Sequence, residues 1–195
     1  MYKVNEIFYS LQGEGYNTGT ASVFVRMSGC NLRCAFCDTK HQGGRLMSLP
    51  QILEEIARWP QAPLVVLTGG EPALSVDGEL VHAIHSLGKR VAIETNGTRP
   101  LPVGIDWVTL SPKGGFAGGE AEPCVLRECD ELKVVYTGQD LSRYDDIKTE
   151  LRFLQPCYCD DDTEREENLK ATVDAVLKHP QWRLSLQTHR ILGIR

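Results

Sequence analysis

The stretch Ser28-Gly29-Cys30-Asn31-Leu32-Arg33-Cys34-Ala35-Phe36-Cys37-Asp38-Thr39 decides how the rest of the chain is interpreted. Its three cysteines have the spacing Cys-x3-Cys-x2-Cys and follow an apolar run. A cubane iron–sulfur cluster has four irons and is normally held by cysteine thiolates. Three cysteines this close can bind three irons from one loop, which leaves the fourth iron open to a small molecule. The spacing therefore predicts a [4Fe-4S] cluster held by Cys30, Cys34 and Cys37.

A zinc site and a set of structural thiols are the alternatives to a cluster at these cysteines. Zinc sites usually combine pairs of cysteines, or add histidines, to reach four ligands. The nearby fourth candidate is His41, although the x3-then-x2 spacing is not that of a zinc ribbon. The three cysteines could also be ordinary structural thiols. Four further cysteines, Cys124, Cys129, Cys157 and Cys159, could form a second metal site or be inert thiols.

Composition and charge limit the classes of protein to which the chain can belong. Its 195 residues suffice for a real core, and we expect residues 1–195 to form one domain. The net charge of -5 and the lack of a basic run argue against a nucleic-acid surface. No apolar stretch is long enough to span a membrane or to act as a signal peptide. Seven cysteines without a disulfide pattern suit a reducing cytoplasm.

Apolar and alternating stretches predict a mostly parallel sheet. The six main strands are expected at residues 21–28, 64–68, 91–95, 107–111, 131–135 and 151–156. A short strand at 7–11 and an extended segment at 183–187 flank them. Helical patterns alternate with the strands, which is typical of α/β proteins. Six strands are too few for a closed eight-stranded barrel, so we expect a partial, splayed β/α barrel with reduced helices.

Three helices are predicted from capping residues and apolar spacing. A capping box at Ser48 and Gln51 precedes the first, and residues 77–87 form the second. The strongest helix is expected to begin at a second capping box, residues 163–166, and to bury Leu169, Val173 and Val176. A short helix is also expected within residues 141–150.

Two charged side chains lie on strands that should be buried. Arg26 shares one face of its strand with Phe24, and its planar fork suits a carboxylate ligand. Glu94 interrupts an apolar run, and a buried carboxylate needs partners. In the simplest case Arg26 is a surface arginine and Glu94 pairs with a nearby Arg or Lys.

Several motifs in a fixed order identify a family. The loop Cys30-x3-Cys34-x2-Cys37, with Phe36 before its last cysteine, resembles the signature of the radical S-adenosylmethionine (SAM) enzymes. The flanking motifs are Leu11-Gln12-Gly13-Glu14-Gly15, Cys37-Asp38-Thr39-Lys40-His41, Thr68-Gly69-Gly70-Glu71-Pro72, Glu94-Thr95-Asn96-Gly97, Ser111-Pro112-Lys113 and Gln187-Thr188-His189. Together they resemble the 7-carboxy-7-deazaguanine synthases, over a stretch from Asn5 to the last residues.

The resemblance implies a set of site residues. SAM would contact Phe36, Cys37, Asp38, Gly70, Glu71, Ser111, Pro112, Lys113 and Gln155. The substrate would contact Leu11, Gln12, Gly13, Glu14, Arg26, Thr68, Glu94, His189 and Arg195. Mg²⁺ would bind beside the substrate carboxylate with an oxygen from Thr39, a hard ligand that suits this ion. Thr39 could instead cap the turn through a local backbone hydrogen bond.

The resemblance also implies a reaction and partners. The substrate would be 6-carboxy-5,6,7,8-tetrahydropterin, which loses a hydrogen at C6, contracts and releases ammonia to give 7-carboxy-7-deazaguanine. An electron donor such as flavodoxin and a homodimer are implied as well. Two rival functions stay open: a radical SAM activase that acts on a partner protein, and an iron–sulfur electron carrier. A carrier should have four cluster cysteines and no SAM loop.

Overall fold

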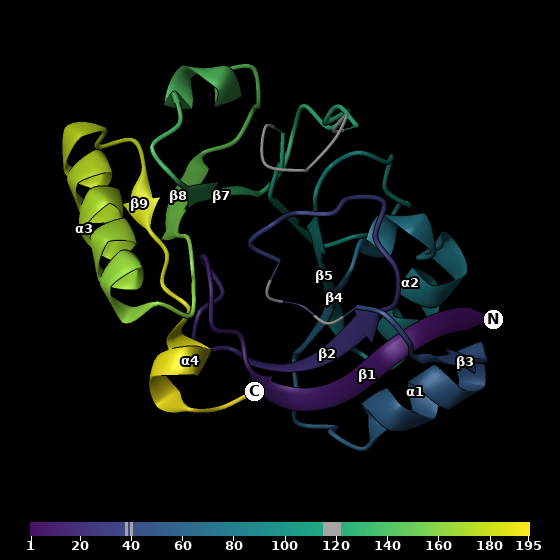
Figure 1. Cartoon of the computed structure of the whole chain (residues 1–195). Helices are drawn as coiled ribbons and strands as arrows, with labels where there is room; N and C mark the ends of the chain where they lie inside the picture. Colours follow the sequence, from purple (N-terminus) through teal and green to yellow (C-terminus); the bar gives the residue numbers. More distant parts are fainter. Residues whose placement is uncertain (38, 40, 115–121) are drawn as a thin grey trace.

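The computed structural model describes residues 1–37, 39, 41–114 and 122–195, and these residues form a nine-stranded sheet (Figure 1). The strand order is β3-β1-β2-β4-β5-β6-β7-β8-β9. No pairing joins β3 to β9 within the described ranges, so the curved sheet stays open. The expected partial, splayed β/α barrel is therefore confirmed.

The parallel part of the sheet contains all six predicted main strands. They are β2 (Ala21–Met27), β4 (Leu64–Gly69), β5 (Arg90–Thr95), β6 (Trp107–Leu110), β7 (Glu131–Tyr136) and β8 (Leu151–Pro156). Each pairs in parallel with the next, and the short β9 (Arg183–Leu184) continues the series. Because the strands are parallel, their carboxyl ends meet at one edge of the sheet.

The N-terminal edge is antiparallel and larger than the sequence predicts. The expected strand at 7–11 is the end of a longer strand, β1 (Tyr2–Leu11), which pairs with β2. A three-residue strand, β3 (Arg45–Met47), pairs with the start of β1 and was not predicted. Its two exposed residues and short length give little periodicity from which to recognise a strand.

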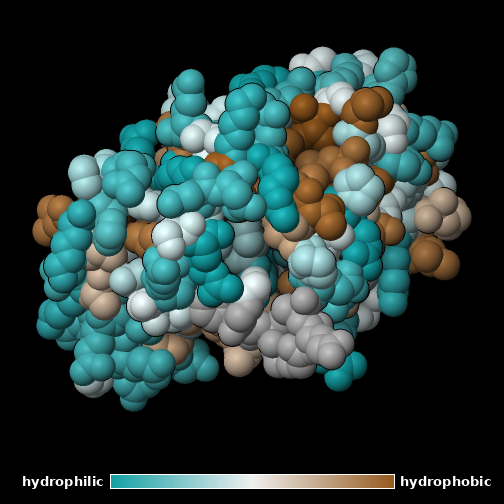
Figure 2. All heavy atoms as spheres, turned by 90° about the horizontal axis from the view of Figure 1, so that it is seen from above, coloured by the Kyte–Doolittle hydropathy of each residue, from teal (hydrophilic) through white to brown (hydrophobic). Residues whose placement is uncertain are grey.

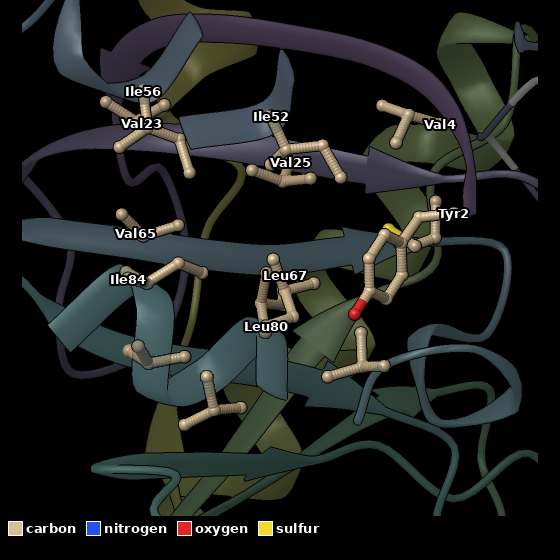
Figure 3. Packing of buried hydrophobic residues seen from close by; sticks show 14 of the residues in the cluster. Tyr2, Val4, Val23, Val25, Ile52, Ile56, Val65, Leu67, Leu80 and Ile84 are labelled. Atoms are coloured by element: carbon tan, nitrogen blue, oxygen red, sulfur yellow. The ribbon is translucent and has the colours of Figure 1, made fainter. Parts of the chain in front are cut away.

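Two short helices cover the outer face of the sheet. Helix α1 (Leu49–Ala57) begins at the predicted capping box, with both Ser48 and Gln51 hydrogen bonds present. Helix α2 (Gly78–His85) is capped by Asp77. Figure 3 shows their apolar side chains packing on residues of β2 and β4 that point outward. Val23, Val25 and Met27 of β2 belong to this outer core. Because side chains alternate along a strand, Phe24 and Arg26 lie on the inner face of the sheet.

The C-terminal helices differ in detail from the prediction. Helix α3 (Asp162–Lys178) is capped by Asp161, whose side chain accepts a hydrogen bond from the Glu164 amide, so the predicted box at 163–166 is wrong. Its buried residues are Thr172 and Ala175. They lie on the face of the helix that contacts β8, which is next to the face predicted from the apolar residues. The predicted stripe only flanks that face, and Leu169 is exposed. A 3-10 turn (Leu141–Tyr144) replaces the short helix expected within 141–150.

The chain ends in a short helix beside the N-terminal strands. Helix α4 (Thr188–Leu192) lies near the end of β1 (Figure 1), and the amide of Thr188 donates to the carbonyl oxygen of Gly13. Figure 2 shows that hydrophilic residues dominate the face of the molecule seen from above. Among the described residues, no helix combines the length and the apolar character that crossing a membrane requires.

Candidate active site

A cavity of about 670 Å³ opens where the parallel strands end. Every described residue predicted to bind the cluster, SAM, substrate or Mg²⁺ lines it, apart from Pro112. Asp38 lies outside the described residues. The topology explains much of the convergence, since the motifs at or after the ends of β2, β4, β5, β6 and β8 share one edge of the parallel sheet. The motif after β1 enters the cavity from the opposite edge, because β1 is antiparallel to β2 and its Leu11 lies beside Ala21.

The three cysteines, here called the cysteine group (Cys30, Cys34 and Cys37), lie on a loop that backbone contacts hold in place. Gly29 has a φ of 92°, a conformation that favours glycine. A Cβ on Gly70 would lie 1.9 Å from the carbonyl oxygen of Gly29, so the loop after β4 packs against the cysteine loop without room for a side chain. The amide of Glu71 donates to that same carbonyl oxygen at 2.9 Å.

An amide network ties the same loop to the end of β5. Asn31 Nδ2 donates to Thr98 Oγ1 at 2.8 Å, and Asn96 Nδ2 donates to Asn31 Oδ1 at 3.1 Å. Asn96 Oδ1 in turn accepts from the amide and the hydroxyl of Thr98. The loop is therefore anchored to β4 and β5 on both sides, which gives its thiols a fixed position.

The thiols of the cysteine group fit a cluster. All three are free and line the cavity. Burial raises the pKa of Cys30 and of Cys34, and the neighbouring Lys113 opposes this rise at Cys34. The Leu32 amide donates to the sulfur of Cys30 at 3.4 Å, the kind of contact that tunes an iron–sulfur centre. Iron binding would remove the thiol protons that burial retains.

A zinc ion and a cubane cluster place different demands on these thiols. In the described part of the chain, no three His, Cys, Asp or Glu side chains gather closely enough to hold one metal ion. A zinc site needs its ligands around a single ion, whereas the cysteines of a cubane bind different irons. His41, the alternative zinc ligand, is absent from the residues that line the cavity.

Glu71 uses its side chain inside the protein. The carboxylate is 1% exposed and accepts hydrogen bonds from Ala73, Thr95 and Asn96, at 2.7–3.0 Å. Burial raises its pKa, against these hydrogen bonds and Lys113. Its side chain thus fixes the glycine loop to the end of β5, and what it presents to the cavity is mainly the backbone beside Gly70.

A second group of side chains forms a connected polar network, here defined as Gln12, Glu14, Glu94 and Lys133. Lys133 Nζ lies 2.5 Å from Glu14 Oε2 and 3.6 Å from Glu94 Oε2. Gln12 Nε2 donates to Glu94 Oε1 at 2.8 Å. Gln187, from the segment before α4, donates to Glu14 Oε1 at 2.8 Å. With Gln187 beside the network, four separate parts of the chain therefore meet here.

Buried charge dominates the polar network. Burial by itself would raise the pKa of Glu14, but the ammonium of Lys133, with help from Gln187, lowers it to about 2. Burial would lower the pKa of Lys133, but the surrounding carboxylates raise it. Both groups are consequently ionised at neutral pH. The pairing of Glu94 with a nearby lysine is also present, because Lys133 is that lysine.

Arg26 belongs to a separate ion-pair chain. Its Nε lies 2.9 Å from Glu6 Oε1, and the other oxygen of Glu6 pairs with Arg195. Both guanidinium groups lie over the ring of Phe8, which stacks on Phe24 at 4.9 Å. Among the described residues, the terminal nitrogens of Arg26 have no hydrogen-bond partner. Arg26 is thus oriented through Nε.

The remaining predicted residues come from segments far apart in the chain. His189 packs so closely on Gly13 that a Cβ there would lie 2.2 Å from its Nδ1. Lys113 donates to Ser111 Oγ at 2.6 Å and lies over the ring of Phe36. Gln155 accepts from Ser185 Oγ at 3.1 Å. Leu11, Thr68 and Thr39 complete the predicted lining.

Sequence reasoning missed three charged residues of the cavity, Glu6, Lys133 and Arg190. Lys133 carried a usable signal, because it alternates with apolar residues in a strand that should be buried, as Glu94 does. Glu6 carried no such signal, since it precedes residues 7–11, the only part of β1 that was predicted to be a strand. None of the other four cysteines lines this cavity.

Comparisons with known proteins bear on the family of the chain. The radical SAM superfamily model matches residues 24–117. A 7-carboxy-7-deazaguanine synthase of Bacteroides thetaiotaomicron is 55% identical over 195 residues, which is 100% of both chains. That of Bradyrhizobium diazoefficiens is 44% identical, with 100% of this chain and 99% of the relative covered.

The chain belongs to the 7-carboxy-7-deazaguanine synthase family.

A solved structure supports the same family. The crystal structure of QueE from Escherichia coli superposes with a TM-score of 0.75 at 30% identity, over 95% of this chain and 93% of that one. As a radical SAM family, the 7-carboxy-7-deazaguanine synthases use a [4Fe-4S] cluster and SAM, and the cysteine group is the set of residues that fits such a cluster. Membership of this family leaves no place for the electron-carrier or the activase alternative.

Proposed function

We propose that this chain converts 6-carboxy-5,6,7,8-tetrahydropterin into 7-carboxy-7-deazaguanine, with loss of ammonia, in the biosynthesis of queuosine and other deazapurines. One observation carries the proposal: the cysteine group and the polar network line the same cavity, in a chain that is 55% identical to a named synthase. A cavity with only the thiols would suit electron transfer, whereas the added network of paired charges suits recognition of a polar heterocycle.

The bound cluster and SAM supply a radical that removes a hydrogen atom from the substrate. The chain's own residues position the two reactants. Cys30, Cys34 and Cys37 would hold three irons, and the backbone beside Gly70 would lie along the methionine part of SAM. The other residues proposed to contact SAM are Phe36, Asp38, Glu71, Ser111, Pro112, Lys113 and Gln155.

The substrate would be held by charge at both of its polar parts. Arg26, oriented through its Nε by Glu6, would bind the carboxylate with its terminal nitrogens. Gln12, Glu14 and Glu94 would accept and donate hydrogen bonds along the ring edge. Leu11, Gly13, Thr68, His189 and Arg195 would complete the pocket. Because these groups are fixed before substrate arrives, little ordering would be needed on binding.

Mg²⁺ would join the site together with the substrate. Thr39 lines the cavity next to the cysteine group, and its hydroxyl is a weak ligand by itself. Mg²⁺ keeps several waters and readily takes oxygens from a bound ligand. We infer that the ion binds between Thr39 and the substrate carboxylate. An electron donor such as flavodoxin, a homodimer and a cytoplasmic location complete the proposal.

Turnover is the direct test. The protein is reconstituted anaerobically with iron and sulfide and mixed with SAM, Mg²⁺, a reductant and the carboxy-pterin. We expect 7-carboxy-7-deazaguanine and one ammonia for each pterin consumed, detected by mass spectrometry. Cys34→Ala should form none, and Cys157→Ala, outside this cavity, should behave as the wild type. A cluster-loaded wild type that binds SAM but leaves the pterin unchanged would refute the proposed substrate.

A further inference from the structure

We propose that Lys133 is a positioning residue: its buried ammonium fixes Glu14 and Glu94 as two charged acceptors for a flat heterocycle whose edge carries N–H groups. This inference rests on the proposed function and deepens it, since a pterin has such an edge. Lys133 lies on β7, 5% exposed, and lines the cavity. Its two partners come from the loop after β1 and from β5.

Both carboxylates retain hydrogen-bonding capacity. A carboxylate offers about four acceptor positions. Glu14 uses one oxygen for Lys133 and the other for Gln187. Glu94 uses one oxygen for Lys133 and the other for Gln12. The side chains of Glu14 and Glu94 are 14% and 24% exposed, so both reach the cavity. Each can still accept hydrogen bonds from a ligand.

The ammonium decides whether these groups accept or donate. Two carboxylates in one poorly hydrated pocket repel each other and favour protonation of one of them. A protonated carboxyl presents an O–H donor, which would face the N–H donors of the heterocycle and lose the bond. A lysine between them removes this conflict. A lysine also leaves more of the carboxylate oxygens accessible than an arginine would, because its ammonium is a compact charge whereas a guanidinium binds both oxygens of a carboxylate.

A third carboxylate lies beneath the network. Glu131 is 2% exposed and accepts from the Tyr16 amide at 2.7 Å and from Thr109 Oγ1 at 3.0 Å. Burial raises its pKa, although Lys133 opposes the rise. On the other side His189, from α4, adds a positive influence on Glu14. In the described part of the chain, Lys133 and His189 therefore act directly on Glu14, while Glu94 and Glu131 share the same lysine.

The test compares two buried lysines. Lys133→Met removes the proposed positioning charge, and Lys89→Met is the matched control. Lys89 is also 5% exposed, but its ammonium donates to backbone carbonyl oxygens of Trp59 and Ala62 at 2.8 and 2.7 Å, outside the cavity. Both substitutions remove one buried ammonium, so both are expected to lower thermal stability. Only Lys133→Met should change recognition of the ligand.

The first measurement is equilibrium binding of the carboxy-pterin to the cluster-loaded, SAM-bound proteins over a range of pH. Wild type and Lys89→Met should bind equally, with little change between mildly acid and mildly alkaline pH. Lys133→Met should bind about 100-fold more weakly at neutral pH. Its affinity should recover as the pH rises, because Glu14 regains its charge. Wild-type affinity in Lys133→Met, without pH dependence, would overturn the proposal.

The second measurement needs no ligand. Carbon-13 NMR of the Glu14 carboxyl, assigned with Glu14→Gln, should give a pKa of about 2 in the wild type. In Lys133→Met we expect a clearly higher value, since the ammonium that opposes the effect of burial is gone and only Gln187 and His189 remain to lower the pKa. An unchanged Glu14 titration refutes the role of Lys133. If the wild type fails to bind the pterin, the proposed substrate is wrong, and the NMR result still decides what Lys133 does to Glu14.

A double variant keeps the proposal testable if Lys133→Met does not fold. If Lys133→Met does not fold, Glu14→Gln/Lys133→Met replaces it, because the double substitution leaves no unpaired charge at that contact. We expect this protein to bind the pterin weakly and without pH dependence. Wild-type affinity in the double variant would show that the ion pair has no part in recognition.

Discussion

The cysteine group and the polar network line one cavity but are held in place by different means. The cysteine group comes from one loop, and backbone contacts around Gly29 and Gly70 fix it. The polar network joins Glu14, Glu94 and Lys133, which are widely separated in sequence, through ion pairs and hydrogen bonds. The first depends on close approach of main chain, and the second depends on charge balance.

This difference has consequences for substitution. A site that is held by close backbone contacts is disrupted when a new side chain overlaps with neighbouring atoms. This disruption does not depend on pH, because steric overlap involves no change of protonation. A charge-built site can remain folded while its protonation changes, because each ionised group depends on its partner. Cluster content should therefore respond to changes in the cysteine group, and pterin affinity should respond to changes around the polar network.

The largest effect should follow loss of a cluster ligand. Cys30→Ala, Cys34→Ala or Cys37→Ala removes one of three thiolates, and we expect no cubane absorption and no SAM cleavage after reconstitution. Cys124→Ala is the control, because that thiol packs against a separate apolar cluster that contains Leu110 and Leu132. If Cys124→Ala lost the cluster to the same extent, the assignment of three ligands would be wrong.

The second largest effect should follow a steric change at Gly70, in the loop after β4. Gly70→Ala would bring a methyl group within 1.9 Å of the Gly29 carbonyl oxygen, so the cysteine loop must move. We expect a stability loss of about 1–3 kcal/mol and reduced iron content. Gly78→Ala, where a Cβ has nothing within 4 Å, should keep the wild-type melting temperature and iron content. Equal iron content in both variants would contradict backbone fixation of the loop.

Much of the fold and of the cavity lining could be predicted from sequence. Buried parallel strands such as 64–68 are marked by continuous apolar runs, and residues after them meet at one edge by topology. Cross-strand charge pairing leaves no such mark. Lys133 and Glu94 become neighbours through the strand order, and Glu6 reaches Arg26 only through antiparallel pairing of β1. The helix cap at Asp161 was missed because Thr163 offered a competing box.

Substrate recognition should be weaker in Arg26→Lys. Lysine keeps the positive charge but loses the planar fork that binds a carboxylate through two nitrogens. We expect pterin affinity to fall about tenfold, measured by equilibrium titration, with unchanged cluster absorption. Arg45→Lys, at an exposed position of β3, serves as control. Unaltered affinity in Arg26→Lys would remove this residue from the carboxylate site.

The smallest effect should follow Thr39→Ala. As a weak ligand among water and substrate oxygens, Thr39 contributes a single contact to Mg²⁺. The variant should keep normal iron content while its activity loses most of its stimulation by Mg²⁺, assayed with and without a chelator. Lower iron content with full Mg²⁺ stimulation would instead assign Thr39 to capping the turn.

The most direct test of the central claim is transfer of a hydrogen atom from the bound pterin to the adenosyl group derived from SAM. The claim is that the cysteine group and the polar network hold a radical source and a pterin in one cavity. The measurement uses carboxy-pterin deuterated at C6 with the reconstituted wild type and follows the label by mass spectrometry. We predict deuterium on the adenosyl carbon derived from SAM. Turnover in which all the deuterium stays on the pterin-derived product, or is lost only to water, would contradict the account.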